Sequence, residues 1–402
     1  FDRLTRIGRG VSWMVDGVIG PDSVEVVDDT TVRITLLQPF APIMQVLPWI
    51  FIVNPRIVEA NLGDDDGQTF LSSNPAGSGA FELTRFEPGN LYGFTRFADY
   101  WREGGGNVQN VVWRIVRETS SQRLLVERGE VHYVLDLTAE DMRAMGEAPG
   151  VTRVIEPTLQ PFYLRMNTAH GPLTDVNLRR AVSYAFDYEA MIDVLEYADL
   201  LHGPFPSGLP GHNGAMEVYR TDMEKARAAL AQSAYPDGGI KLRYVHVSGY
   251  DQQRRIGLVF LDALQQLGIE LEIQPLTWSD MVAEARSPET QGDFMAVWQS
   301  SNYADLDNFA YPAFHSSQNG NWSNPVFNDP AIDAMILQAR TETDPAERTR
   351  IYEEMQANLV GQATDIYCAT LQRLIAHRDA LSGYSYTPIG TNAPEFFPLS
   401  LS

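Results

Sequence analysis

The chain has 402 residues, of which 30 are Lys or Arg and 52 are Asp or Glu, so its formal net charge at pH 7 is −22. This charge excludes a general nucleic-acid binder, because such an acidic surface repels the phosphate backbone. Hydrophobic residues make up 44% of the chain, a composition typical of globular proteins and not of acidic disordered ones. The length exceeds what one hydrophobic core usually serves, so we expect two or more domains.

The sequence does not contain a membrane-spanning pattern. A span needs roughly 18 apolar residues, and the most hydrophobic stretch, residues 39–55, is interrupted by prolines. The chain opens on Phe1 without a basic and apolar leader, so we expect either a removed targeting segment or a start inside a longer protein. Its one cysteine, Cys368, cannot form an internal disulfide.

The first part of the chain predicts short strands separated by turns. Apolar residues alternate with polar ones over residues 24–36 around Asp28 and Asp29, which is typical of a β-hairpin. A second strand, turn and strand is predicted over residues 74–97, with its turn at residues 87–90. A helix is expected to start at Thr119, with Leu124 and Leu125 facing inward, between two further strands.

From Phe162 onward, strands and helices alternate. We predict helices that begin at Asp175, Asp187, Asp222, Asp329 and Asp344, because aspartate is a favoured N-cap residue. Between them lie predicted strands near residues 241–249, 269–276, 293–301 and 367–378. This alternation favours an α/β fold with two regions that meet near Phe162.

Motifs for catalysis, metals and cofactors were tested and not supported. The seven histidines include no HExxH pair, and His202 and His212 are interpreted as residues of a solvated loop. Ala76 and Ala80 stand where a nucleophile elbow around Ser78 would need glycine. We therefore predict neither a cofactor nor a metal, and no catalytic residue.

One aromatic and polar segment, residues 297–325, follows a predicted buried strand. Open α/β sheets bind ligands at the carboxyl ends of their strands, so this segment is the candidate pocket wall. The candidate ligand contacts, including two from the strand near Phe162, are Trp298, Asn302, Tyr303, Asp305, His315, Asn321, Trp322, Phe162 and Tyr163.

Four stretches, in order along the chain, resemble the family 5 extracellular solute-binding proteins of ABC importers, the dipeptide, oligopeptide and nickel-binding group. They are VEVVDDTTVRITLLQPFAP from Val24, NPAGSGAFEL from Asn74, MNTAHGPLTDVNLRRAVSYAFD from Met166 and WSNPVFNDPAIDAMI from Trp322. The resemblance covers nearly all of the 402 residues. Family members have a further segment that would precede Phe1, and this sequence does not include it.

The resemblance implies a two-lobed α/β fold of the periplasmic-binding-protein type (type II, cluster C). It implies a partial extra domain at residues 1–73, one lobe from residues 74–164 plus 372–402, and a second lobe at residues 165–371. Hinge crossings are expected near Phe162 and Leu371. It further implies a non-enzymatic, periplasmic or lipid-anchored receptor, expected to be a monomer, that delivers a small solute to an importer permease.

The resemblance also raises a question about the ligand. Peptide-binding members carry an aspartate that pairs with the peptide ammonium, and Asn302 stands in that place here. Asp305 could substitute, although its place matches a family aspartate of structural role. An oligosaccharide stacked on Trp298 and Trp322 is therefore an alternative to an oligopeptide. Other open alternatives are a secreted hydrolase with a carboxylate pair and a receptor-like sensor.

Overall fold

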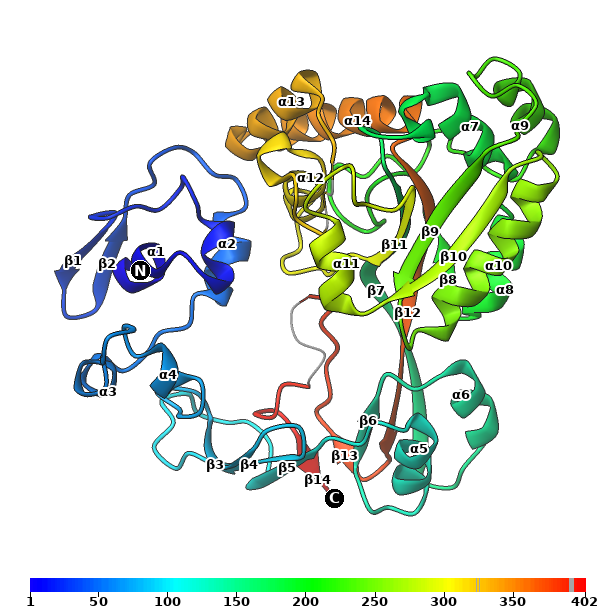
Figure 1. The fold of residues 1–402 in the computed structure, drawn as a ribbon. Coiled ribbons are helices and arrows are strands. Elements are labelled where there is room, and N and C mark those ends of the chain that lie inside the picture. Colours follow the sequence, from blue (N-terminus) through cyan, green and yellow to red (C-terminus); the bar gives the residue numbers. More distant parts are fainter. Residues whose placement is uncertain (323, 325, 390–393) are drawn as a thin grey trace. The chain divides into compact units, whose positions relative to one another are not determined.

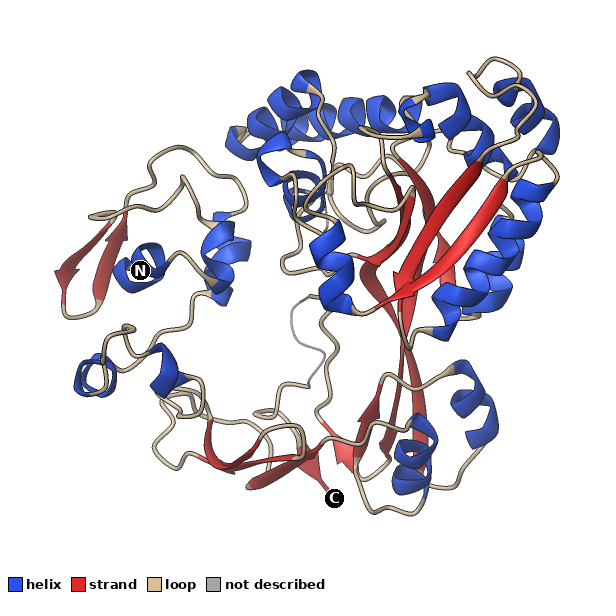
Figure 2. Ribbon diagram, in the orientation of Figure 1, coloured by secondary structure: helices blue, strands red, loops and turns tan. Residues whose placement is uncertain are grey.

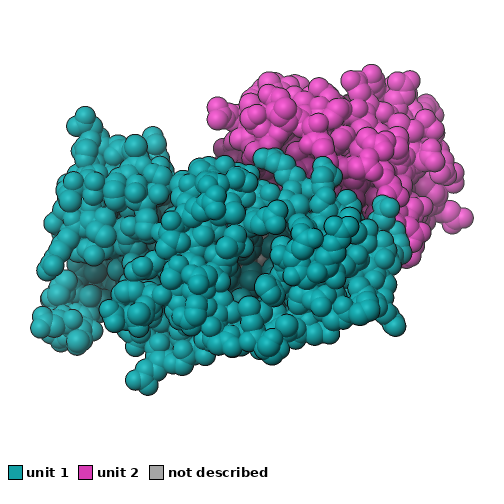
Figure 3. Space-filling model, turned by 90° about the horizontal axis from the view of Figure 1, so that it is seen from below, with its two compact units in different colours: residues 1–38, 43–156, 373–402 teal, residues 39–42, 157–372 magenta. Residues whose placement is uncertain are grey.

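The computed structural model describes residues 1–322, 324, 326–389 and 394–402. Contacts within the chain divide it into two compact units, which Figure 3 colours separately. Unit 1 contains residues 1–38, 43–156 and 373–402, and unit 2 contains residues 39–42 and 157–372. The main segment of unit 2 thus starts at Pro157, whereas the sequence placed the start of the second lobe at residue 165. The separate extra domain over residues 1–73 stays a prediction.

Unit 2 is built on a mixed β-sheet with α8 and α10 along one side and α11 and α12 on the other (Figure 1). The strand order is β10-β9-β11-β7-β12, and β8 also pairs with β12. The strands are β7 (Val151–Met166), β8 (Ala198–Leu200), β9 (Lys241–Val247), β10 (Glu270–Leu276), β11 (Phe294–Trp298) and β12 (Asp365–Arg378). Strands β9, β10 and β11 are parallel, so their carboxyl ends meet at one edge of the sheet.

Five helices of unit 2, which Figure 2 colours blue with the others, begin where the sequence predicts. The helical segments are η3 (Pro172–Thr174), α7 (Val176–Ala185), α8 (Tyr188–Leu195), α9 (Met223–Leu230), α10 (Asp251–Gln265), α11 (Trp278–Glu284), α12 (Asp307–Phe314), η4 (Ser316–Gln318), α13 (Pro330–Thr341) and α14 (Pro345–Gly361). The carboxylates of Asp175, Asp187, Asp222, Asp329 and Asp344 accept backbone N–H groups at helix starts. These five predictions are confirmed, because each cap satisfies donors that the helix leaves unpaired.

The core of unit 2 gathers around its central strands. The side chains of residues 294–297 in β11 are at most 2% exposed, and those of residues 366–369 in β12 are equally buried. Strands covered on both faces are nearly continuously apolar, which explains why β11 reads as FMAVW instead of alternating. Cys368 is a free thiol within this core.

Unit 1 consists of short strands, short helices and long connections. Its elements are α1 (Asp2–Ile7), η1 (Gly10–Met14), β1 (Val24–Asp28), β2 (Thr31–Ile34), α2 (Ile43–Val46), η2 (Leu47–Trp49), α3 (Pro55–Ala60), α4 (Gln68–Leu71), β3 (Phe81–Glu87), β4 (Leu91–Arg96), β5 (Asn110–Arg114), α5 (Thr119–Glu127), β6 (Tyr133–Leu135), α6 (Ala139–Met145), β13 (Leu381–Ser382) and β14 (Ser400–Leu401). Strands β3, β4 and β5 form one antiparallel sheet, and β6 pairs with the second half of β12.

Both predicted turns of unit 1 are confirmed, but one predicted helix face is wrong. Strands β1 and β2 form the expected hairpin, and β3 turns into β4 over residues 87–90. In α5, however, Leu124 is 39% exposed, whereas Val126 is fully buried. Two adjacent leucines cannot both face inward on a helix, and the tertiary packing of α5 uses Val126 instead. None of the helices in the described ranges has the length and hydrophobicity of a membrane span.

His246 of β9 is a titratable group inside the unit 2 sheet. Its side chain is 3% exposed, and its Nδ1 lies 3.2 Å from the Val247 carbonyl oxygen. Burial lowers the pKa of His246, with Arg254 acting in the same direction and the Val247 carbonyl and Asp251 opposing it. The unfolded chain therefore takes up a proton below about pH 6.5 that the folded chain resists.

We expect the free energy of unfolding to fall as the pH drops from 7.5 to 5.5, and His246→Gln to reduce that fall. One such histidine contributes at most about 1.4 kcal/mol for each pH unit. Urea denaturation at the two pH values measures the difference. His132→Gln, at an exposed position, is the matched control for the histidine-to-glutamine change itself. Equal pH dependence in all three proteins would contradict the expectation.

Candidate ligand-binding site

The carboxyl ends of the three parallel strands of unit 2 carry aromatic side chains. Tyr250 follows β9, Trp278 follows β10, and Trp298 is the last residue of β11. Trp322 joins them from the segment after α12, since its ring packs against that of Trp278. A chain of α/β topology places its ligands at this edge, so we define these four residues as the aromatic face.

The aromatic face contains two edge-to-face ring pairs. The ring centroids of Tyr250 and Trp298 are 4.7 Å apart at an interplanar angle of 88°, and those of Trp278 and Trp322 are 5.2 Å apart at 65°. Tyr250 is 48% exposed and Trp278 is 47% exposed. These two rings therefore offer flat apolar surface to a solute, while Trp298 and Trp322 pack against them edge to face.

Sequence analysis predicted Trp298 and Trp322 but missed Tyr250 and Trp278. The sequence does contain a signal for Tyr250 and Trp278, because each lies within three residues of the end of a strand. The segment after Trp298 was predicted on the same ground. Applying the strand-end rule to all three strands would have found them.

Phe162, Tyr163 and Tyr303 belong to the core in this structure. Phe162 and Tyr163 pair with Trp298 and Val297 of β11, and both are completely buried. The Tyr163 hydroxyl donates to the carbonyl oxygen of Pro204 at 2.5 Å. Tyr303 is 1% exposed, and its hydroxyl donates to Asp307. None of the three presents surface to a ligand in this structure, and their role as ligand contacts stays a prediction.

Asp305, another predicted contact, is committed to an ion pair. Its Oδ2 and Oδ1 accept hydrogen bonds from Nη1 and Nη2 of Arg348 at 2.8 and 2.7 Å. Oδ1 also accepts the backbone N–H of Asp307 at 2.8 Å. Both partners of the ion pair are mostly buried, with side-chain exposures of 8% and 15%. A carboxylate held in this way is not available to a ligand ammonium.

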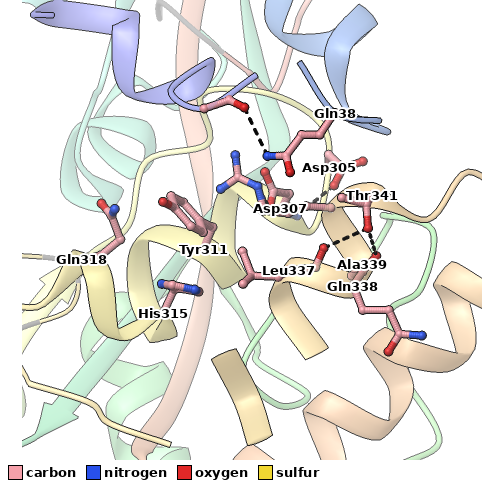
Figure 4. A network of polar contacts seen from close by, with 12 residues as sticks. Gln38, Asp305, Asp307, Tyr311, His315, Gln318, Leu337, Gln338, Ala339 and Thr341 are labelled. Carbon is pink, nitrogen blue, oxygen red and sulfur yellow. Dashed lines mark hydrogen bonds and ion pairs between the residues drawn. The ribbon is translucent and has the colours of Figure 1, made fainter. Parts of the chain in front are cut away.

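Asp307 is the second carboxylate of the segment, and it is completely buried. Its Oδ2 accepts the Tyr303 hydroxyl at 2.8 Å, and its Oδ1 lies 3.7 Å from Nε of Arg340. Burial raises the pKa of Asp307, the charge of Asp305 adds to this, and Arg340 opposes it. The Arg340 guanidinium also lies 3.7 Å from the ring centroid of Tyr311. Figure 4 shows Asp305, Asp307 and Tyr311 together.

Asn302 lies in a turn whose backbone is hydrogen-bonded to the buried side chain of Asn308. The Asn302 backbone N–H donates to Oδ1 of Asn308 at 3.0 Å, and Nδ2 of Asn308 donates to the Ser300 carbonyl oxygen at 3.0 Å. Asn308 is 1% exposed, whereas Asn302 is half-buried. The turn therefore holds Asn302 at the surface of unit 2 just after β11.

The remaining predicted contacts, His315, Asn321 and Trp322, lie in one loop. His315 accepts the Ser317 backbone N–H through Nδ1 at 3.1 Å, and burial lowers the pKa of His315. The Asn324 backbone N–H donates to the Asn321 carbonyl oxygen at 3.0 Å. All three side chains are half-buried. Their contact with a ligand stays a prediction.

The described residues show no group of three or more His, Cys, Asp or Glu side chains placed to hold a metal ion. Burial lowers the pKa of His212 in the loop before Gly214, and the nearby His202 acts in the same direction. Two histidines alone do not make a metal centre.

We expect Arg348→Met to destabilise the chain by about 3–5 kcal/mol, because it leaves Asp305 buried and unpaired. Combining it with Asp305→Leu should cost much less than the sum of the two single changes. Urea denaturation of the four proteins gives the coupling energy. Arg350→Met on the same helix removes an exposed pair with Glu347 and should cost less than about 1 kcal/mol. An Arg348 variant as stable as the Arg350 variant would contradict this structural role.

Comparison with known proteins gives one family model and many similar chains. The model describes the middle part of the bacterial extracellular solute-binding proteins of family 5, and it matches residues 5–321. The chain is 27% identical over 398 residues to the probable D,D-dipeptide-binding periplasmic protein DdpA of Escherichia coli, covering 97% of this chain and 75% of the relative. It is also 27% identical to heme-binding protein A of Haemophilus influenzae, covering 92% and 68% of the two chains.

Solved structures share the fold. The periplasmic binding protein DppA of Helicobacter pylori, solved in complex with the peptide STSA, superposes with a TM-score of 0.81 at 22% identity. The match covers all of this chain and 76% of that one. The predicted fold class, a two-lobed α/β binding protein, is confirmed.

Proposed function

This chain belongs to the family 5 bacterial extracellular solute-binding proteins, and we propose that its ligand is a small peptide-like solute bound on the aromatic face of unit 2. The chain is a solute-binding protein of an ABC importer and not an enzyme. The alternative of a secreted hydrolase has no support from the family. A sensor role has none in the described residues either.

The names of similar proteins support one class of ligand, and the ion pair of Asp305 narrows that class. Proteins similar to this chain are named for a D,D-dipeptide or were solved with a peptide, which supports a peptide-like solute here. However, the bidentate bond to Arg348 removes Asp305 as a partner for an ammonium group. Asn302 carries an amide, which donates and accepts hydrogen bonds but holds no charge. We therefore propose a solute whose amino end is blocked or is bound without an ion pair at residues 298–308.

A hydroxyl-rich solute such as an oligosaccharide is the second candidate. The exposed rings of Tyr250 and Trp278 favour it, since flat aromatic surface stacks on sugar rings as well as on apolar side chains. The two candidate ligands differ in the polar groups that they would present to the Asn302 side chain. A peptide would present its amide groups, and a sugar its hydroxyls.

We further propose that the units reorient about the strands that continue between them. Chain continuity runs through β7 near residues 156–157 and through β12 near residues 372–373. Small changes in backbone dihedrals at such crossings reorient whole units. A ligand that binds better to one orientation of the units would shift the population toward that orientation. A monomeric receptor, tethered to the membrane by a lipid, stays part of the proposal.

We expect Asn302→Asp to gain affinity for peptides with a free amino terminus, by roughly tenfold or more. A new ion pair in a shielded site is typically worth more than the about 1.4 kcal/mol that a tenfold change requires. Isothermal titration calorimetry with tetrapeptides and their N-acetylated forms measures this gain.

The acetylated peptides serve as the control, since they should bind equally to both proteins. Tight binding of free peptides by the unaltered chain, lost on acetylation, would refute the proposal. An Asn302 variant without any gain would do the same.

We expect Trp278→Ala to weaken ligand binding about tenfold or more and to change stability by less than about 1 kcal/mol, because the ring is half exposed. The ligand first has to be identified, by native mass spectrometry of the purified protein. Leu258→Ala on α10, with 47% exposure, is the matched control and should bind as the wild type does. Equal affinities of the two variants would exclude the aromatic face as the binding site.

A further inference from the structure

Arg165 lies near the end of β7 and connects the sheet to the segment that carries Asn302. Its side chain is 4% exposed. Nη1 donates to Oδ2 of Asp365 at 3.1 Å, and Nη2 donates to Oε1 of Gln299 at 2.7 Å. The guanidinium also lies 4.4 Å from the ring centroid of Tyr163 and 5.1 Å from that of Phe314. Arg165 is therefore fixed on two sides and paired with a buried carboxylate.

Gln299 connects Arg165 to the turn that carries Asn302. Its Nε2 donates to the Asn308 carbonyl oxygen at 3.2 Å, and Asn308 in turn binds Ser300 and Asn302. The turn that presents Asn302 is thus joined to Arg165 through two buried amide side chains.

Asn324 anchors the second segment, the loop with His315, Asn321 and Trp322. It is completely buried, and its Nδ2 donates to the His315 carbonyl oxygen at 2.8 Å. Its backbone N–H binds the Asn321 carbonyl oxygen. One residue therefore holds both ends of this loop.

The two anchors line the same small cavity. The cavity is lined by Arg165, Met166, Thr168, Ala313, Phe314, Asn324, Val326, Phe327, Thr364 and Asp365, and it has room for about one water molecule. Nε of Arg165 and Oδ1 of Asn324 are both buried, and within the described part of the chain neither has a hydrogen-bond partner. One is a donor and the other is an acceptor, and leaving either unpaired is costly.

We infer that this cavity binds one water molecule, which accepts a hydrogen bond from Arg165 Nε and donates one to Asn324 Oδ1. A neutral molecule fits the site because Asp365 already balances the charge of Arg165. An apolar occupant would leave both polar atoms unpaired. The water joins the two ligand-bearing segments to one guanidinium, so it positions the loop of the proposed binding site.

High-resolution diffraction from crystals of the whole chain tests the water directly. The expected result is an ordered oxygen within about 3.2 Å of both Arg165 Nε and Asn324 Oδ1. A cavity without ordered density, or density too large for water, would overturn the inference.

Ala313→Val tests its positioning role by filling the cavity without removing a polar group. If the water is bound, displacing it leaves Arg165 Nε and Asn324 Oδ1 unpaired. Hydrogen exchange of the backbone amides of residues 315–324 should then be about tenfold faster than in the wild type. If the cavity is dry, filling it should slow exchange.

Ala310→Val is the control, because Ala310 is equally buried in α12 and lies outside the cavity lining. It reports the effect of overpacking alone. Equal exchange in the two variants, or slower exchange in the Ala313 variant, would overturn the inference. The inference rests on the proposed function only in one respect, namely that the loop with His315, Asn321 and Trp322 contacts the ligand. Both measurements need no ligand, so their failure would leave the proposed function standing, and failure of the peptide titrations would leave the water site standing.

Discussion

The ion pair between Asp305 and Arg348 determines how the candidate site is built. Arg348 lies in α14, and its Nε also donates to the Ala339 carbonyl oxygen of α13 at 2.8 Å. Asp305 in turn accepts the backbone N–H of Asp307 at the start of α12. One buried pair thus joins three helices to the segment that follows β11. Because breaking such a pair leaves a charge in the interior, the segment has little freedom to rearrange around a ligand.

Amide side chains continue this anchoring in the segments that we propose to contact the ligand. Asn308 and Asn324 are buried, and each bonds to backbone groups on both sides of a turn. A site held from inside in this way presents its outer residues in a fixed geometry, which reduces the entropy lost on binding. The exposed rings of Tyr250 and Trp278 follow the strand ends of β9 and β10.

Much of the fold could be predicted because its signals are local. Asp175 and Asp344 cap the helices that directly follow them, and a helix start depends on a few neighbouring residues. Burial was harder to predict. Phe162 lies in a strand covered on both faces, where alternation no longer tells inside from outside. The role of Asp305 depends on Arg348, 43 residues further along the chain, and no local pattern records such a partner.

The chain combines a net charge of −22 with a proposed binding segment whose two carboxylates, Asp305 and Asp307, are both engaged internally. An anionic solute would approach against the field of the whole protein, and a cationic one would not find a free carboxylate at residues 298–308. Ring contacts and hydrogen bonds, which salt screens little, must then supply most of the affinity. Under these conditions, discrimination between solutes comes from polar groups that a wrong solute leaves unpaired. An unsatisfied buried amide costs more binding free energy than the loss of one apolar contact does. The side-chain amide of Asn302, a residue whose backbone N–H is bound by Asn308, is our candidate for this discrimination.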